Sequence, residues 1–307
     1  MSHHKTQIPA WASTLPELYE AYLDFMLSRQ AMICSQRTME WYRTTLETVL
    51  NWMIQHQISR PAEITAHEVR AYLSDMSARG LTDIYIHNHA RAIRTLLIFW
   101  HNEKYIPERV QFKMPILALK KLHYLTANEV QKLIDVCTTT RDTALLLLMV
   151  DTGVRRAELC ALNWQDVDIA SGLIHIESGK GGKARSVVAG VRTRRALLAD
   201  RRELNPDPAS PLFQTSDGQR LHAMGVRSTL DRLGNKANVK VSPHALRRTF
   251  ATLSLKAGMN PLHLQALLGH STLEMTRRYI RMMDDDLIEA HREHSPIDKM
   301  LSEMKKR

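Results

Sequence analysis

Cysteine is scarce in this chain, with only Cys34, Cys137 and Cys160 among 307 residues, and no two of them form a Cys-x-x-Cys pair. This scarcity argues against a disulfide scaffold and against a zinc site built on thiolates, and it is typical of a reducing cytosol. Long apolar runs are also missing, because the longest one, residues 144–150, is far too short to cross a membrane. The first residues, MSHHKTQIPAW, contain no apolar core, so we expect a cytoplasmic protein without a signal peptide.

Two signatures of metal and nucleotide chemistry are absent as well. The histidines do not form an HExxH motif, since the spacing of His291 and His294 is wrong for it. His87 and His89 lie two apart, which on a helix directs them to different faces. The P-loop pattern fails because Lys183 is not followed by Ser or Thr. We therefore expect no metal site and no nucleotide-binding P-loop.

Acidic residues are in the minority, and the imbalance lies in the second part of the chain. Residues 1–119 carry 12 Lys and Arg against 11 Asp and Glu, whereas residues 120–307 carry 30 against 21. A length of 307 residues suggests two domains, and the second therefore holds nearly all of the net charge of +10. Such a basic domain is consistent with binding to the phosphates of a nucleic acid, although solubility alone explains the charge equally well.

Residues 13–106 have a helical pattern throughout and no strand pattern. Apolar residues recur at helical spacing from residue 14, from 35 to about 55 and from 82 to 102, and a capping box begins a further helix over 65–80. We predict a small helical bundle, preceded by a tail over 1–12. Prolines then interrupt a basic, extended stretch, which predicts an interdomain linker over 107–124.

Residues 125–307 are predicted to form a second, mostly helical domain with a C-terminal tail. Within it the period of the apolar residues changes towards two, and glycines mark the turns of a hairpin with Lys180 at one tip. The fold class is thus mainly α (α+β), with a helical bundle followed by a mostly helical domain that contains a small antiparallel β-sheet. The expected strands cover 173–177 and 185–188, and the expected helices cover 143–150, 192–204, 224–233, a stretch from 243, 261–269 and 273–282.

Four segments of the second domain carry the groups that phosphate chemistry needs. A hydroxyl such as that of Tyr279 is a nucleophile, imidazoles move protons, and a planar guanidinium binds a phosphate bidentately. His244 and Arg247 lie three apart, on one face of a predicted helix, and Glu158 is predicted to share a helix face with Arg155 and to orient its guanidinium. The segments are TGVRRAEL (152–159), SGKGGKAR (178–185), HALRR (244–248) and LLGHSTLEMTRRY (267–279).

In this order the four segments resemble the motifs of the tyrosine recombinase family, which includes the Xer recombinases, lambda-type integrases and Cre. They are similar, in turn, to its T-G-x-R-x-x-E-L box, its lysine hairpin, its His-x-x-Arg box, and its Gly-His box with the tyrosine. The resemblance is good over about 125–280 and looser before it. It implies that Arg155 and Arg247 clamp the phosphate, Lys180 is the general acid, His244 handles the tyrosine proton, His270 donates to a phosphate oxygen, Tyr279 is the nucleophile and Glu158 supports Arg155.

The resemblance implies a site-specific DNA recombinase that acts through a 3′-phosphotyrosyl intermediate and a Holliday junction, in integration, excision, transposition or resolution. No cofactor is expected, because the phosphotyrosine stores the phosphodiester energy. The implied partners are double-stranded DNA target sites, further copies of the chain in a tetramer, and an accessory or partner recombinase. No membrane is expected, and the nucleoid in the cytoplasm is the expected location. We expect no arm-binding domain of the lambda-integrase type before the helical bundle, which favours an Xer-like or mobile-element recombinase.

The first domain would then be the family's core-binding, SAM-like helical domain, which covers one face of the DNA. Exposed helix surface explains each of its basic residues equally well. Two alternatives remain: a non-catalytic DNA-binding accessory protein on the same fold, and a type IB topoisomerase-like enzyme. The complete set of polar residues argues against the first, and the compact size and Gly-His box argue against the second. The candidate phosphate contacts of the first domain and the linker are Arg37, Arg43, Arg91, Arg94, Lys113, Lys120 and Lys121.

Overall fold

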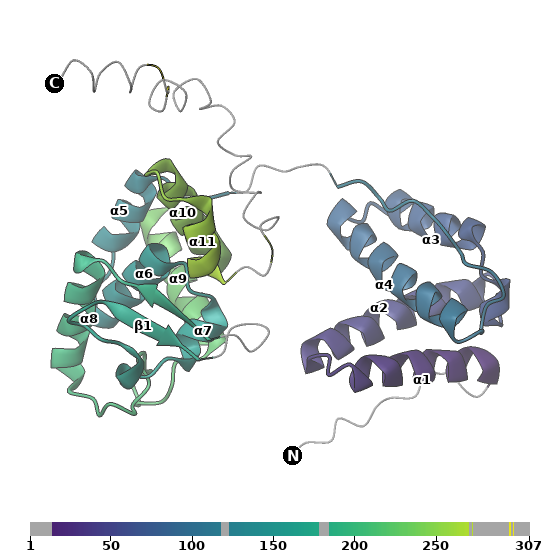
Figure 1. Cartoon of the computed structure of the whole chain (residues 1–307), viewed down its shortest axis with the longest axis horizontal. Helices are drawn as coiled ribbons and strands as arrows, with labels where there is room; N and C mark the ends of the chain where they lie inside the picture. Colours follow the sequence, from purple (N-terminus) through teal and green to yellow (C-terminus); the bar gives the residue numbers. More distant parts are fainter. Residues whose placement is uncertain are drawn as a thin grey trace. The chain divides into compact units, whose positions relative to one another are not determined.

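The computed structural model describes residues 14–117, 123–177 and 184–269, together with the single residues 272, 295 and 297. The chain divides into two compact units, residues 1–120 and 121–307, each with a hydrophobic core of its own (Figure 1). The predicted tail over 1–12 and the predicted helix over 273–282 lie outside the described residues. Within the described ranges, no helix combines the length and the apolar character that a membrane crossing requires.

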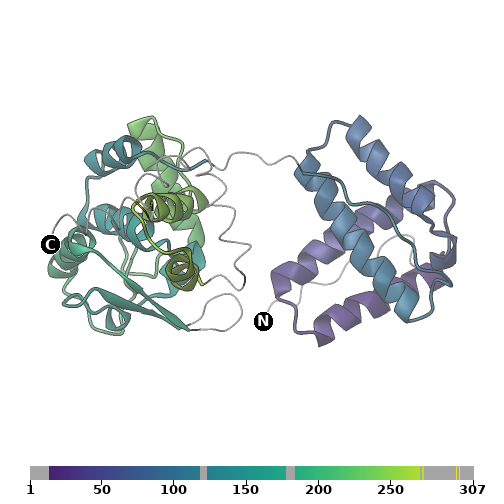
Figure 2. The ribbon, with the colours of Figure 1, turned by 45° about the horizontal axis from the view of Figure 1, so that its top comes forward.

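The first unit is a helical bundle, as the sequence predicts (Figure 2). Hydroxyl side chains cap the starts of α2, α3 and α4, and each of them accepts a hydrogen bond from a backbone N–H in the first turn. The indole N–H of Trp100 on α4 donates to the carbonyl of Ala21 on α1 at 2.8 Å, which joins the two helices in the core. The bounds are α1 (Pro16–Ala31), α2 (Gln36–Gln55), η1 (Pro61–Glu63), α3 (Ala66–Ala78) and α4 (Asp83–Asn102).

The chain after α4 remains attached to the first unit. Residues 103–117 contain neither helix nor strand, yet Val110 and Phe112 pack against the core of the bundle. The Nδ1 atom of His87 on α4 also donates to the carbonyl of Pro115 at 2.9 Å. The first part of the predicted linker over 107–124 therefore packs on the bundle that it follows.

A buried histidine makes the stability of this bundle dependent on pH. His89 of α4 is 2% exposed and shares a hydrogen bond of 2.7 Å with the hydroxyl of Tyr72. Burial lowers the pKa of His89 from its ordinary value of 6.5 to about 4. The unfolded chain therefore takes up a proton at a higher pH than the folded chain. The stabilisation is complete above pH 6.5 and is lost as the pH falls to about 4, in total by about 3 kcal/mol.

We expect the His89→Gln variant to lose part of this pH dependence. Urea unfolding of the full chain, followed by circular dichroism between pH 7 and 4.5, should show a shallower fall in midpoint for the variant than for the wild type. His67→Gln is the control, because His67 is exposed on α3. Equal slopes for the wild type and His89→Gln would contradict the assignment of the pH dependence to His89.

The second unit is mostly helical and contains a two-stranded antiparallel sheet, as predicted. β1 pairs with β2 in the register Leu173↔Val188 to Ile176↔Arg185. The predicted buried helix is the central one, α6, which packs against α8 and α10. The bounds are α5 (Ala127–Asp135), α6 (Thr140–Thr152), α7 (Arg156–Ala161), η2 (Trp164–Asp166), β1 (Leu173–Ile176), β2 (Arg185–Val188), α8 (Val191–Leu204), α9 (Ala223–Ala237), α10 (Pro243–Lys256) and α11 (Pro261–Leu268).

Helix α9 is longer than the predicted stretch over 224–233. It continues through Gly234 to Ala237 and ends at Asn238, whose φ of 51° is left-handed. A Cβ on Gly234 would lie 2.6 Å from the carbonyl oxygen of Val239, so the chain after the helix folds back against this glycine. Gly234 thus lies within the helix and does not end it, and its lack of a side chain lets the backbone at Val239 come close.

Candidate active site

The TGVR segment is a helix end followed at once by a helix start. α6 ends at Gly153, whose φ of 60° favours glycine, and a Cβ there would lie 2.4 Å from Cδ1 of Phe250. Arg155 then precedes α7 as its N-cap residue, with an extended backbone at φ −71° and ψ 148°. The prediction that Arg155 and Glu158 share a helix face was therefore wrong, because Arg155 lies before the helix and not within it.

Glu158 nevertheless holds Arg155, by a capping geometry. Its Oε2 atom accepts from the backbone N–H of Arg155 at 2.8 Å, and its Oε1 atom accepts from Nη1 of the same guanidinium at 2.7 Å. An acidic residue three positions into a helix commonly reaches back to the N-cap in this way. The contact that the sequence predicts between the two side chains is thus present, and Glu158 also accepts a hydrogen bond from the backbone N–H of Arg155.

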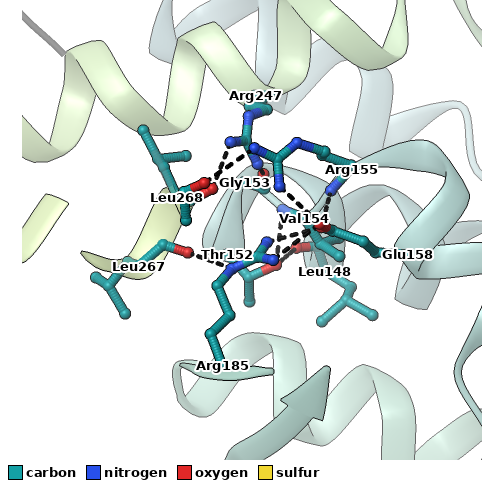
Figure 3. A network of polar contacts seen from close by, with 11 residues as sticks. Leu148, Thr152, Gly153, Val154, Arg155, Glu158, Arg185, Arg247, Leu267 and Leu268 are labelled. Atoms are coloured by element: carbon teal, nitrogen blue, oxygen red, sulfur yellow. Dashed lines mark hydrogen bonds and ion pairs between the residues drawn. The ribbon is translucent and has the colours of Figure 1, made fainter. Parts of the chain in front are cut away.

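Arg185 is a third member of this cluster and was not among the residues predicted from the sequence (Figure 3). It donates from Nη1 to Oε1 and from Nη2 to Oε2 of Glu158, at 2.8 and 2.7 Å. Strand alternation could have found it, because Arg185 and the buried Val187 lie two apart on β2 and so share one face. Burial raises the pKa of the Glu158 carboxyl, but hydrogen bonds from Arg185 and Arg155 outweigh that and lower it to about 2. Glu158 is therefore charged at neutral pH.

Arg247 joins the ends of two helices from its place on α10. Its side chain is buried, and it donates from Nη1 to the carbonyl of Gly153 at 2.6 Å and from Nη2 to the carbonyl of Leu268 at 2.6 Å. These carbonyls lie at the C-terminal ends of α6 and α11, where backbone acceptors have no partner within the helix. Arg155 reaches the same place, since its Nη2 donates to the carbonyl of Gly269 at 3.2 Å. The structure thus brings together the two arginines that the sequence places in separate boxes.

His244 lies in the first turn of α10, three residues before Arg247, where the Ser242 side chain caps the helix. Partial burial lowers the pKa of His244, and the positive charges of Arg248, Arg156 and Arg247 lower it further. A histidine with a lowered pKa is neutral at pH 7 and has a ring nitrogen that can accept a proton. The environment of His244 therefore suits a proton acceptor.

Three of the six predicted catalytic residues, Lys180, His270 and Tyr279, lie outside the described residues, as do Lys120 and Lys121. The remaining candidate phosphate contacts belong to the first unit. Arg37 and Arg43 lie on α2, Arg91 and Arg94 lie on α4, and Lys113 follows α4. All of these are exposed except Arg43, which is half-buried.

Comparisons with known proteins cover both units. Residues 123–285 match the phage integrase family, and residues 19–104 match the phage integrase N-terminal SAM-like domain. The tyrosine recombinase XerC of Thermodesulfovibrio yellowstonii is 30% identical over 285 residues, which cover 86% of this chain and 92% of the relative. The tyrosine recombinase XerA of Thermococcus kodakarensis is 30% identical over 296 residues, which cover 94% of this chain and 97% of the relative.

Solved structures have the same fold. A crystal structure of XerA recombinase aligns with a TM-score of 0.52 at 25% identity and covers 90% of this chain and 97% of its own. A lambda integrase dimer bound to a COC′ core site aligns with a TM-score of 0.69 at 18% identity, over 85% of this chain and 94% of its own, a likeness of fold. Because one family matches more than half of the chain and relatives at 30% identity span most of it, the chain belongs to the tyrosine recombinase family and is a site-specific tyrosine recombinase.

Proposed function

We propose that this recombinase cleaves DNA with Tyr279 and binds the scissile phosphate with Arg155 and Arg247. One observation carries the proposal: Arg247 donates to Gly153, 94 residues away, and both arginines donate to carbonyls at the end of α11. Two guanidiniums that meet at one place can neutralise the charge that develops on a pentacovalent phosphorus. His270 follows Gly269 directly in the sequence.

The proposed reaction is a transesterification. The hydroxyl oxygen of Tyr279 forms a bond to the scissile phosphorus, and the bond from phosphorus to the 5′-oxygen breaks. His244 takes the phenolic proton, Lys180 gives a proton to the leaving 5′-oxygen, and His270 donates to a phosphate oxygen. The same steps in reverse, starting from the 5′-hydroxyl of a second duplex, rejoin the strands. Because the phosphotyrosine stores the bond energy, the exchange requires no external energy source.

The proposed partners are double-stranded DNA and further copies of the chain. Structures with the same fold include a lambda integrase dimer bound to a core site and a transposon integrase in complex with a circular intermediate DNA, which supports both DNA binding and oligomerisation. We extend this to a tetramer that exchanges strands through a Holliday junction on the nucleoid, in integration, excision, transposition or resolution. Residues 13–106 would cover one face of the duplex, residues 107–124 would link the domains, and residues 125–307 would hold the catalytic centre. The proposed phosphate contacts are Arg37, Arg43, Arg91, Arg94, Lys113, Lys120 and Lys121.

A covalent trap tests this function. The full-length protein is mixed, in EDTA, with nicked DNA substrates from either side of its native gene, and the reaction is stopped with detergent. We expect a protein–DNA adduct at a 3′ strand end, and peptide mapping should place the nucleotide on the peptide that contains Tyr279. Tight, site-specific binding to the nicked substrate without any adduct would contradict the proposal and would favour a DNA-binding protein that does not cleave.

A further inference from the structure

The C-terminal turn of α11 accepts hydrogen bonds from three arginines through three consecutive carbonyls. Arg185 Nε donates to the carbonyl of Leu267 at 2.9 Å, and Arg247 Nη2 donates to that of Leu268 at 2.6 Å (Figure 3). Arg155 Nη2 donates to the carbonyl of Gly269 at 3.2 Å. The last carbonyls of a helix lack partners within it and form the negative end of its dipole, so they suit guanidinium donors. The three arginines come from β2, from α10 and from the residue before α7. This one turn therefore fixes the relative positions of three separate segments.

Arg185 differs from Arg155 in its environment. Its side chain is 10% exposed, whereas that of Arg155 is 25% exposed. Each of its three guanidinium nitrogens donates inside the fold, two to Glu158 and one to Leu267. Arg155 bonds the same carboxylate and retains an accessible edge. Arg155 is thus suited to meet a phosphate, and Arg185 is suited to hold the groups around it.

Gly269 leaves space for this arrangement. A Cβ on Gly269 would lie 3.0 Å from Cδ, 3.2 Å from Nε and 3.3 Å from Cζ of Arg185. Its φ of 62° also lies in the left-handed region, which favours glycine. The Arg185 side chain therefore lies directly against the last residue before His270, as well as against the carboxylate that holds Arg155.

We propose that Arg185 is a positioning residue, which holds the Arg155 guanidinium, through Glu158, in a fixed geometry relative to the carboxyl-terminal turn of α11. The inference rests on the proposed function, because it gives Arg155 a phosphate to bind. Glu158 is a buried carboxylate that accepts from two guanidiniums at once. Without Arg185 this carboxylate would lose two charge-assisted hydrogen bonds. The C-terminal turn of α11 would also lose one of the three hydrogen bonds that it accepts from arginines. Arg155 would then bond to a Glu158 carboxylate and to an end of α11 that are both held in place by fewer hydrogen bonds.

The first test is the Arg185→Met variant, which keeps an apolar side chain and removes the guanidinium. Single-turnover adduct formation on a nicked substrate at saturating DNA should slow by about 100-fold, the cost of a small misplacement of catalytic groups. The dissociation constant for DNA should stay within about threefold, because Arg185 is buried. Arg185→Lys keeps the charge without the fork, so its adduct rate should still fall by about 10-fold. Wild-type rates in both variants would overturn the proposal.

Arg220→Met is the matched control for a loss of fold stability. Arg220 also donates to backbone carbonyls, those of Cys160, Ala161 and Leu162 at the other end of α7, and has no bond to Glu158. We expect this variant to be destabilised in thermal unfolding and to form adduct within about threefold of the wild-type rate at a temperature where it is folded. An equal slowing of adduct formation in Arg220→Met and Arg185→Met would overturn the proposal, since any loss of contacts to α7 would then be enough to slow the reaction.

A double-mutant cycle separates positioning through Glu158 from an independent role. In a Glu158→Gln background, Arg185→Met should slow adduct formation by less than about fivefold further, because the charge through which Arg185 acts is already gone. A full 100-fold loss in that background would show that the two residues act independently, and would overturn the proposal. If the wild type itself forms no adduct, the proposed function is wrong. If the wild type forms adduct and Arg185→Met forms it equally fast, only the positioning role of Arg185 is wrong.

Discussion

The Tyr279→Phe variant is expected to bind its DNA site with unchanged affinity and to form no covalent adduct. The change removes one hydroxyl oxygen, and in the proposed mechanism that oxygen is the atom that bonds to phosphorus. Without that oxygen, adduct formation should fall by more than about 10⁴-fold. Gel-shift titration measures the affinity, and detergent-resistant adduct on a nicked substrate measures the cleavage step.

The chain supplies a matched control for this change. Tyr124 and Tyr279 are the two tyrosines after residue 120, and Tyr124 lies just before α5, where it is half-buried. Tyr124→Phe removes the same atom and should form adduct at close to the wild-type rate. An adduct that persists in Tyr279→Phe and disappears in Tyr124→Phe would transfer the nucleophile to Tyr124, and an adduct in both variants would require a different nucleophile.

The Arg247→Ala variant should show the second-largest effect, because in the proposed mechanism Arg247 binds the phosphate, and in the fold it joins the ends of α6 and α11. Removing one preorganised donor to a developing negative charge typically slows a reaction by about 10²- to 10³-fold. The same change also leaves the carbonyls of Gly153 and Leu268 without their bonds of 2.6 Å, which costs about 1–3 kcal/mol for each acceptor that stays buried. We therefore expect adduct formation at saturating DNA to fall by at least about 10³-fold, together with a lower melting temperature.

Two further variants separate these two roles of Arg247. Arg247→Lys keeps a positive charge but lacks the planar fork that reaches both carbonyls, so its adduct rate should remain at least about 10²-fold below that of the wild type. Arg227→Ala removes an exposed arginine of α9, which is paired with Asp231, and should leave the adduct rate at saturating DNA within about threefold. An Arg247→Ala rate within tenfold of the wild type would contradict its place in the phosphate clamp.

Local signals were enough to predict most of the helices that the structure describes, because these signals depend on residues close together in the chain. The side chains of Ser35 and Thr65 cap helices where the sequence places their starts, since a cap requires only a hydroxyl and the next turn. The four motifs could likewise be found in the sequence, because each is defined by residue types at short, fixed spacings. They identified the family that the comparisons with known proteins then established.

Contacts between distant segments could not be read in this way. The spacing of Arg155 and Glu158 suggested a shared helix face, but Gly153 ends α6 and makes Arg155 a cap residue instead. Strand alternation places Arg185 on the same face of β2 as the buried Val187, but it does not reveal that Arg185 donates to Glu158, 27 residues earlier, and to Leu267, 82 residues later.

The sequence thus specified which groups this recombinase has, and in which order, because helix caps, apolar periodicity and motif spacing act over a few residues. The packing of α6, α10, α11 and β2 specified where those groups meet, since one turn of helix collects three arginines from three segments. Hydrogen bonds to a helix end depend on the distance between segments in space, and that distance is set by the burial of the core around α6.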